Sequence, residues 1–390
     1  MQIPFNDTEV AFKAKSDRDL YQAYLLFKLV GSSRFVSLSS SALNVLIKTP
    51  LPFDPLVKAT LFRQFCGGEN AKECATTINR LGALGVGTIL DYSIEGAQEE
   101  TVFDSTEKEL LSTLTLASQS KHIPFSVFKI TGLARFSLLE KIQSGSSLDS
   151  SESSEWARAQ ERVRRIIKRA SELKVKVLID AEESWIQDPL DELVENLMAE
   201  FNQKEAIVYH TLQMYRVDRI SYLGRLIEES RKKHFILGVK LVRGAYLEKE
   251  RQRAADLGLP SPILPSKQAT DQAYDDSLAL SMENFPQVAI CAGTHNEHST
   301  QLLVDLMEKQ GISPNTQQIH FAQLLGMSDH LTFNLAAAGY QAAKYVPYGP
   351  VRSLTPYLIR RAQENTSISG QTPRELELIS KELQRRRALK

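Results

Sequence analysis

Four side chains that could bind a small anion recur at helical spacing near the end of the sequence. Residues 345–365, YVPYGPVRSLTPYLIRRAQEN, predict a strand end that breaks at Pro347 and Gly349 and a helix that starts after Pro356, where proline suits a first turn. Positions i, i+3, i+4 and i+7 of that helix share one face. They hold Tyr357, Arg360, Arg361 and Glu364. Two guanidiniums can grip a carboxylate bidentately, so the face predicts an anion site, with a solvated Arg–Glu surface as the ordinary alternative.

Further polar residues lie near the ends of apolar, β-rich runs earlier in the chain, or just after them. In a parallel barrel the carboxyl ends of the strands meet at one mouth, where catalytic groups lie. Any one of these residues alone would be read as a solvated or structural group. Their recurrence at successive strand ends predicts one site. They are Lys129, Asp180, Gln213, Lys240, Arg243, Tyr246, Thr294, His295 and Asn296.

Eight apolar runs alternate with amphipathic stretches from residue 85 onward. Near-continuous apolar strands are typical of a parallel sheet covered by helices. Eight such units in about 280 residues predict an α/β fold, a closed (β/α)8 TIM-type barrel over residues 85–390. A doubly wound sheet is the alternative, but no G-x-G-x-x-G follows the first strand. The runs span 86–93, 125–131, 175–181, 206–215, 236–244, 288–295, 319–325 and 342–348.

Residues 1–84 predict a separate N-terminal helical arm. Apolar residues recur at helical spacing in YQAYLLFKLV and SALNVLIK, and two further helices are predicted at 56–68 and 70–85. The Ser-rich insertion SGSSLDSSESSEW, residues 144–156, predicts a mobile surface loop because it has little apolar surface to bury. The charged stretch 372–387 predicts a helix packed outside the barrel.

Composition restricts the class of protein. Basic and acidic residues number 47 each among 390, so no net field favours nucleic acid. Three cysteines are too few for a disulfide framework and lack zinc spacing, which favours the cytoplasm. The first residues do not resemble a secretory or mitochondrial signal, and no apolar run approaches the ~20 residues of a membrane span. A peripheral encounter at the inner face of a membrane is left open.

Several motifs carry a family resemblance. The run Y-V-P-Y-G-x6-P-Y-L-I-R-R-x2-E-N resembles the C-terminal signature of the proline dehydrogenases, FAD enzymes that oxidise L-proline. KLVRGAYLEKER, IDAEE and THN resemble the family's fifth-, third- and sixth-strand motifs, and they occur in the family's order. The resemblance extends from about residue 84 to residue 365. It implies oxidation of L-proline to 1-pyrroline-5-carboxylate, the first step of proline catabolism, by hydride transfer to flavin N5.

The resemblance also implies roles for single residues. Asp180 and Lys240 would be catalytic, although many bacterial members have arginine at Lys240, whose planar fork lysine lacks. Glu364 would either brace the two arginines or contact the ligands. The substrate residues would be Lys129, Tyr246, Leu324, Tyr345, Tyr357, Arg360 and Arg361. The FAD residues would be Ala181, Gln213, Lys240, Arg243, Gly244, Ala245, Thr294, His295, Asn296 and Glu364.

Alternatives and partners complete the expectations. THNEH, with His295 and His298, suggests a metal-dependent barrel hydrolase, but a further ligand set is missing and we expect no metal. Oxidation of 4-hydroxyproline is the closer alternative; Tyr345 against the ring's far edge would leave no room for a hydroxyl. The family implies a membrane quinone as electron acceptor. Because the chain continues for about 25 residues after RRAQEN, we expect a separate pyrroline-carboxylate dehydrogenase. The base that deprotonates the amine is left unassigned.

Overall fold

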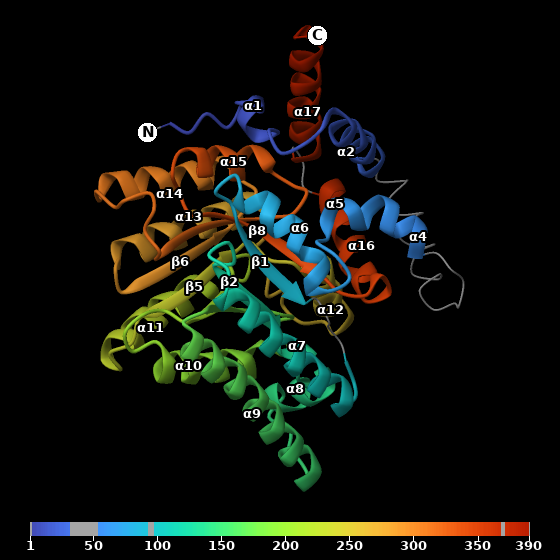
Figure 1. The fold of residues 1–390 in the computed structure, drawn as a ribbon. Coiled ribbons are helices and arrows are strands. Elements are labelled where there is room, and N and C mark those ends of the chain that lie inside the picture. Colours follow the sequence, from blue (N-terminus) through green and yellow to red (C-terminus); the bar gives the residue numbers. More distant parts are fainter. Residues whose placement is uncertain (1, 32–53, 93–96, 368–370, 390) are drawn as a thin grey trace. The chain divides into compact units, whose positions relative to one another are not determined.

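Eight parallel strands form a closed barrel in sequence order, as predicted. The computed structural model describes residues 2–31, 54–92, 97–367 and 371–389 (Figure 1). The strands are β1 (Gly87–Tyr92), β2 (Phe125–Lys129), β3 (Lys176–Asp180), β4 (Val208–Gln213), β5 (Leu237–Val242), β6 (Val288–Gly293), β7 (Ile319–Leu324) and β8 (Ala342–Tyr348). The chain divides into two compact units, Ile94–Phe321 and Gln2–Ser93 together with Ala322–Lys390. The predicted boundary between an arm and a barrel at residue 84 stays a prediction.

The first unit contains β2 to β6, whose neighbours pair in parallel. Every residue of β4 is buried, as a strand between two covered faces requires. Figure 1 shows α7, α9 and α10 in the same part of the fold. Helix α9 contacts both α7 and α10, and α7, α9 and α10 contact β2, β3 and β4 respectively. The helices are α7 (Glu100–Ser118), α8 (Phe136–Gln143), α9 (Ser150–Leu173), α10 (Gln187–Phe201), α11 (Arg219–Lys232), α12 (Leu247–Asp256), α13 (Lys267–Glu283) and α14 (Glu297–Lys309), with a short 3-10 helix, η2 (Ile130–Gly132), after β2.

The Ser-rich insertion is not a loop throughout, and the prediction is wrong from residue 150, where α9 begins. Asp149 accepts a hydrogen bond from the Glu152 N–H at 2.8 Å, and Glu152 accepts one from the Asp149 N–H at 3.0 Å. This capping box satisfies donors that the first turn would leave unpaired. Glu152 forms an ion pair with Lys141 at 2.6 Å, and Glu155 forms one with Arg135 at 2.8 Å. These pairs attach the first turns of α9 to the α8 region. Together these contacts offset the weak helix propensity of the serines.

The second unit contains β1 and β8, paired in parallel, and helices from both ends of the chain. Leu378 and Ile379 of the predicted C-terminal helix pack on Phe12, Leu20 and Phe27. The predicted helix at residues 41–48 lies outside the described residues. The helices are α1 (Thr8–Ala11), α2 (Asp17–Val30), α4 (Asp54–Val57), the π-helix η1 (Lys58–Phe62), α5 (Arg63–Phe65), α6 (Ala71–Gly82), α15 (Asp329–Ala337), α16 (Val351–Ser367) and α17 (Gln371–Ala388).

A lysine in the middle of β8 is fully buried in an ion pair. Lys344 Nζ lies 2.8 Å from Asp329 Oδ1, and Lys15 Nζ lies 2.9 Å from Asp329 Oδ2. Lys344 also donates to the carbonyl oxygens of Leu324, at 3.3 Å, and Met327. Although burial opposes it, the two ammonium groups lower the pKa of Asp329 below its ordinary value. The pair fixes the segment after β7 against β8.

The strand break predicted at Pro347 and Gly349 agrees with the structure, because β8 ends at Tyr348, whereas the helix start predicted after Pro356 is wrong by a few residues. Strand β8 continues through Pro347 to Tyr348, so Tyr345 lies in the middle of the strand. Helix α16 begins at Val351 and contains Pro356 in its interior. Proline there removes one backbone donor. The first turn is retained because Thr355 Oγ1 donates to the Val351 carbonyl at 2.8 Å and because Val351 packs in an apolar cluster.

Candidate active site

Two lysines flank one carboxylate at the carboxyl ends of β2, β3 and β5. Lys129 and Asp180 end their strands in register, and Lys129 Nζ lies 3.5 Å from Asp180 Oδ2. Lys240 Nζ contacts the other oxygen, Asp180 Oδ1. The three side chains are only 8–12% exposed. Asp180 therefore holds both ammonium groups at one mouth of the strands.

The ends of β4 and β5 are joined by a side-chain amide. Gln213 Oε1 accepts from the Ala245 N–H at 3.0 Å, and Gln213 Nε2 donates to the Glu182 carbonyl at 2.7 Å. Gly244 has φ +142°, and a Cβ there would lie 2.5 Å from the Tyr215 ring. Only glycine fits this close approach without a shift of the ring. The turn therefore presents the backbone of 244 and 245 beside Gln213.

Arg243 directly follows β5, and its guanidinium reaches the first turn of α14, where it is bound on three sides. Its guanidinium donates to Asp271 at 2.6 Å, Thr294 at 2.6 Å and Ser299 at 2.9 Å, and it stacks 4.4 Å over the Tyr274 ring. Asn296 caps α14 by accepting from the Ser299 N–H at 3.1 Å. A guanidinium beside a helix N-terminus favours an anionic group.

This donor set fits a flavin dinucleotide. The phosphates of such a cofactor suit Arg243 and the α14 N-terminus, and its ring carbonyls suit the ammonium group of Lys240. Ala181 is buried directly after Asp180, whereas Tyr246 and His295 are half-buried beyond their strands. The structure thus brings the predicted cofactor residues of the first unit to neighbouring strand ends, and their roles stay predictions.

The second unit contains both predicted arginines and three of the four predicted ring-wall residues, Leu324, Tyr345 and Tyr357. Leu324 packs on the apolar cluster that contains Tyr357, and the Arg361 guanidinium lies 5.1 Å from the centre of the Tyr357 ring. Arg361 is 7% exposed, while Arg360 on the same helix is half-buried. The one-turn spacing of Tyr357 and Arg361 therefore places them together, as expected for i and i+4. The side chain of Glu364 lies outside the described residues.

Tyr345 faces away from the helix-covered side of β8. Lys344 points to Asp329 of α15, and successive strand side chains alternate between faces. Tyr345 is 9% exposed, and its carbonyl accepts from the Leu325 N–H at 2.9 Å. This backbone hydrogen bond holds the segment after Leu324 next to Tyr345.

The metal-site alternative gains no support from the histidines. His298 Nδ1 lies 3.2 Å from Asp275 Oδ2, on a side chain that is 80% exposed. Within the described ranges, no group of three or more His, Cys, Asp or Glu residues is arranged to hold a metal ion.

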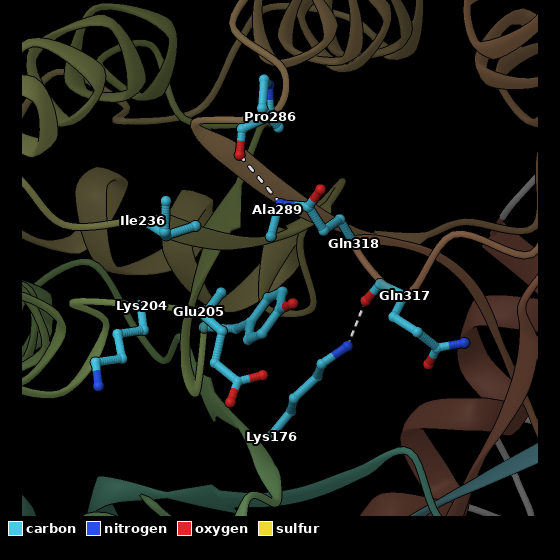
Figure 2. Close-up of a pocket in the computed structure, with 10 residues that line it drawn as sticks. Lys176, Lys204, Glu205, Ile236, Pro286, Ala289, Gln317 and Gln318 are labelled. Atoms are coloured by element: carbon cyan, nitrogen blue, oxygen red, sulfur yellow. Dashed lines mark hydrogen bonds between the residues drawn. The ribbon is translucent and has the colours of Figure 1, made fainter. Parts of the chain in front are cut away.

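A hollow of about 340 Å³ lies at the opposite ends of the strands (Figure 2). Lys176, which begins β3, extends to the Gln317 carbonyl there, and burial lowers the pKa of Lys176 to about 8. Asp180 ends the same strand, so this hollow is not at the mouth with the candidate groups. None of the predicted site residues lines it. The lining residues are Lys176, Lys204, Glu205, Ala206, Tyr209, Ile236, Pro286, Ala289, Gln317 and Gln318.

Sequence reasoning missed three residues that organise these groups. Glu182 lies in the IDAEE motif, two residues beyond Asp180. An acidic residue just past a strand end indicates a place near the site, so the sequence alone could have pointed to Glu182. Asp271 and Ser299 contact Arg243 from α13 and α14. Their proximity depends on how these helices pack, and no local pattern indicates it.

Comparison with known proteins identifies the class. The family model described as "Proline dehydrogenase" matches residues 74–374. Proline dehydrogenase 1, mitochondrial, of Dictyostelium discoideum is 32% identical over 97% of this chain and 74% of its own. Carbapenem antibiotics biosynthesis protein CarD of Pectobacterium carotovorum is 33% identical over 83% of both chains. Hydroxyproline dehydrogenase of Xenopus laevis is 32% identical over 98% of this chain and 90% of its own.

A solved structure shares the fold. Proline utilization A (PutA) from Bdellovibrio bacteriovorus superposes with a TM-score of 0.72 at 20% identity. The likeness covers 92% of this chain but only 38% of that chain. The closed barrel and the charged groups at its strand ends define a (β/α)8 barrel enzyme. The chain belongs to the proline dehydrogenase family.

Proposed function

We propose that this protein oxidises L-proline to 1-pyrroline-5-carboxylate with FAD as its cofactor. The observation that supports this most is the buried Lys129–Asp180–Lys240 group in a chain of the proline dehydrogenase family. Bound FAD would accept the hydride. Proline offers a carboxylate, a ring amine and an apolar ring, for which the chain supplies cations and tyrosines.

The substrate roles follow from charge. Lys129, Arg360 and Arg361 would bind the carboxylate, with guanidinium forks fixing its orientation. An orientation held by several donors makes the reaction effectively unimolecular. Asp180 would keep Lys129 and Lys240 in place and reduce the repulsion between them. Tyr246, Leu324, Tyr345 and Tyr357 would enclose the ring and exclude water.

The cofactor would be held by Gln213, Arg243, Thr294 and the backbone of 244 and 245. Lys240 and Arg243 would place positive charge where negative charge develops during transfer. The remaining residues proposed to contact FAD are Ala181, His295, Asn296 and Glu364. These roles are supported by the donor set described above.

Partners follow from the same chemistry. The electron acceptor we propose is a membrane quinone, and a separate pyrroline-carboxylate dehydrogenase would consume the product. None of the helices in the described ranges is long and apolar enough to span a bilayer. The cytoplasmic location stays a prediction, while several relatives carry "mitochondrial" in their names.

A direct assay tests the proposal. Purified protein with FAD should reduce an artificial dye only when L-proline is present, and o-aminobenzaldehyde should trap the cyclic imine product. Flavin-loaded protein that forms no adduct from proline would overturn the proposal. The same assay with trans-4-hydroxyproline tests the second candidate, which the Xenopus laevis relative favours by its name.

Tyr345 is expected to set the preference between the two substrates. Tyr345→Ser opens space and adds a hydrogen-bonding group, whereas an aromatic wall leaves an added hydroxyl unpaired. We expect kcat/KM for proline to fall and the preference over trans-4-hydroxyproline to shrink about tenfold or more, ~1.4 kcal/mol. Tyr345→Phe keeps the wall and should retain the preference. An unchanged ratio in the serine variant would mean that Tyr345 does not contact the ring.

A further inference from the structure

A second acid of the IDAEE motif is buried beyond the end of β3. Glu182 is 2% exposed. Its Oε1 accepts from the Thr131 N–H at 3.0 Å, and its Oε2 bonds to the Thr131 hydroxyl. Lys129 and Asp180 pair in register, and Thr131 and Glu182 each lie two residues further on. The Glu182 side chain therefore continues the β2–β3 pairing past the strands, where backbone pairing has ended.

The backbone of Glu182 is held as firmly as its side chain. Its N–H donates to Gln187 Oε1 at 2.8 Å, and its carbonyl accepts from Gln213 Nε2 at 2.7 Å. Gln213 in turn accepts from the Ala245 N–H at 3.0 Å. Thr131, Glu182, Gln187 and Gln213 are each at most 3% exposed, so these bonds have no competition from bulk water. One residue thus links the ends of β2, β3 and β4, and through Gln213 that of β5.

We propose that Glu182 is a positioning residue that sets the Lys129–Asp180 pair relative to Gln213 and Ala245, and so couples carboxylate binding to cofactor binding. The proposal rests on the proposed function, because it assigns the first pair to substrate and the second to FAD. A shift of about 1 Å between such groups can cost about 100-fold in rate. Glu182 itself touches neither ligand and acts through the groups that it holds.

Hydrogen bonding at Glu182 does not require its charge. Burial raises the pKa of Glu182 to about 8, and the nearby charge of Glu183 raises it further. The hydrogen bonds from Thr131 and the charge of Lys129 act in the opposite direction and lower the pKa. The bond between Glu182 Oε2 and the Thr131 hydroxyl can form with the proton on either oxygen. An amide at this position can make the same two contacts, which gives a conservative variant.

Four variants test the proposal. Glu182→Ala removes the link, Thr131→Val removes only the hydroxyl bond, and Glu182→Gln retains both contacts. Glu183→Gln is the matched control, since Glu183 is the next residue, is also buried and pairs with Lys249 instead. The measurements are KM and kcat for proline, the dissociation constant of cyclopentanecarboxylate from the flavin difference spectrum, FAD content and Tm.

We expect Glu182→Ala to raise KM and the cyclopentanecarboxylate dissociation constant about tenfold or more, with a smaller fall in kcat per bound FAD. Thr131→Val should show a smaller rise, and Glu182→Gln and Glu183→Gln should stay within about threefold of wild type. If Glu182→Ala does not fold, the rise in KM and in the dissociation constant of the Thr131→Val variant tests the positioning role. A lower Tm with unchanged KM and dissociation constant would overturn the positioning role. Wild-type protein that loads FAD but does not oxidise proline would instead refute the proposed function.

Discussion

Arg361→Lys is expected to weaken binding of proline by ~1.5–3 kcal/mol, the contribution of a charge-assisted hydrogen bond, or about 10- to 150-fold. Lysine keeps the charge but loses the planar fork. It also loses the stacking on Tyr357, whose ring centre lies 5.1 Å from the guanidinium carbon. KM for proline and the dissociation constant of a non-oxidisable ring carboxylate should rise together, while bound FAD is retained.

Arg352→Lys provides the matched control on the same helix. Arg352 pairs with Asp54 at 3.3 Å and is 38% exposed, so an exchange of cations there should change affinity little. If Arg361→Lys loses its flavin while affinity for proline is unchanged, Arg361 belongs to the cofactor site.

Asp329→Ala should lower the free energy of unfolding by ~3–5 kcal/mol, because Lys344 would be left buried with an uncompensated charge. Denaturant unfolding measures this as a shift of the midpoint at constant slope. Glu377→Ala, which breaks an exposed pair with Arg374, should cost no more than ~1 kcal/mol. Asp329→Ala combined with Lys344→Met should recover much of the loss. A single-variant loss below ~1 kcal/mol would contradict this account of the pair.

The pair also predicts a direction for acid stability. Since the pKa of Asp329 is lowered in the folded chain, its stabilisation is present above its ordinary value of 3.8 and is lost as the pH falls toward the folded value. Below pH 3.8, the stability difference between wild type and Asp329→Asn should therefore narrow. A difference that stays constant down to strong acid would contradict the pKa direction.

The barrel was predictable because its strands are buried on both faces and so appear as apolar runs. The loop predicted at 144–156 is wrong from residue 150, because the Asp149–Glu152 capping box, whose residues are visible in the sequence, starts a helix there despite the Ser-rich composition. The start of α16 was missed because packing of Val351 overrides the preference of Pro356 for a first turn.

The candidate site was predictable only in part. Lys129 and Asp180 end their strands and Lys240 lies two residues before the end of β5, and a closed parallel barrel brings such ends to one mouth. The contacts of Arg243 with Asp271 and Ser299 join residues 28 and 56 positions apart, which depends on helix packing rather than on local spacing.

The absorption spectrum of the purified protein under anaerobic conditions tests the central claim most directly. We expect a bound-flavin spectrum whose long-wavelength band is bleached by stoichiometric L-proline, and more weakly by trans-4-hydroxyproline. The control is D-proline, which presents its α-hydrogen with the opposite stereochemistry and should leave the band unchanged. A flavin band that L-proline does not bleach, or a protein that binds no flavin when FAD is supplied, would contradict the assignment of proline oxidation to this barrel.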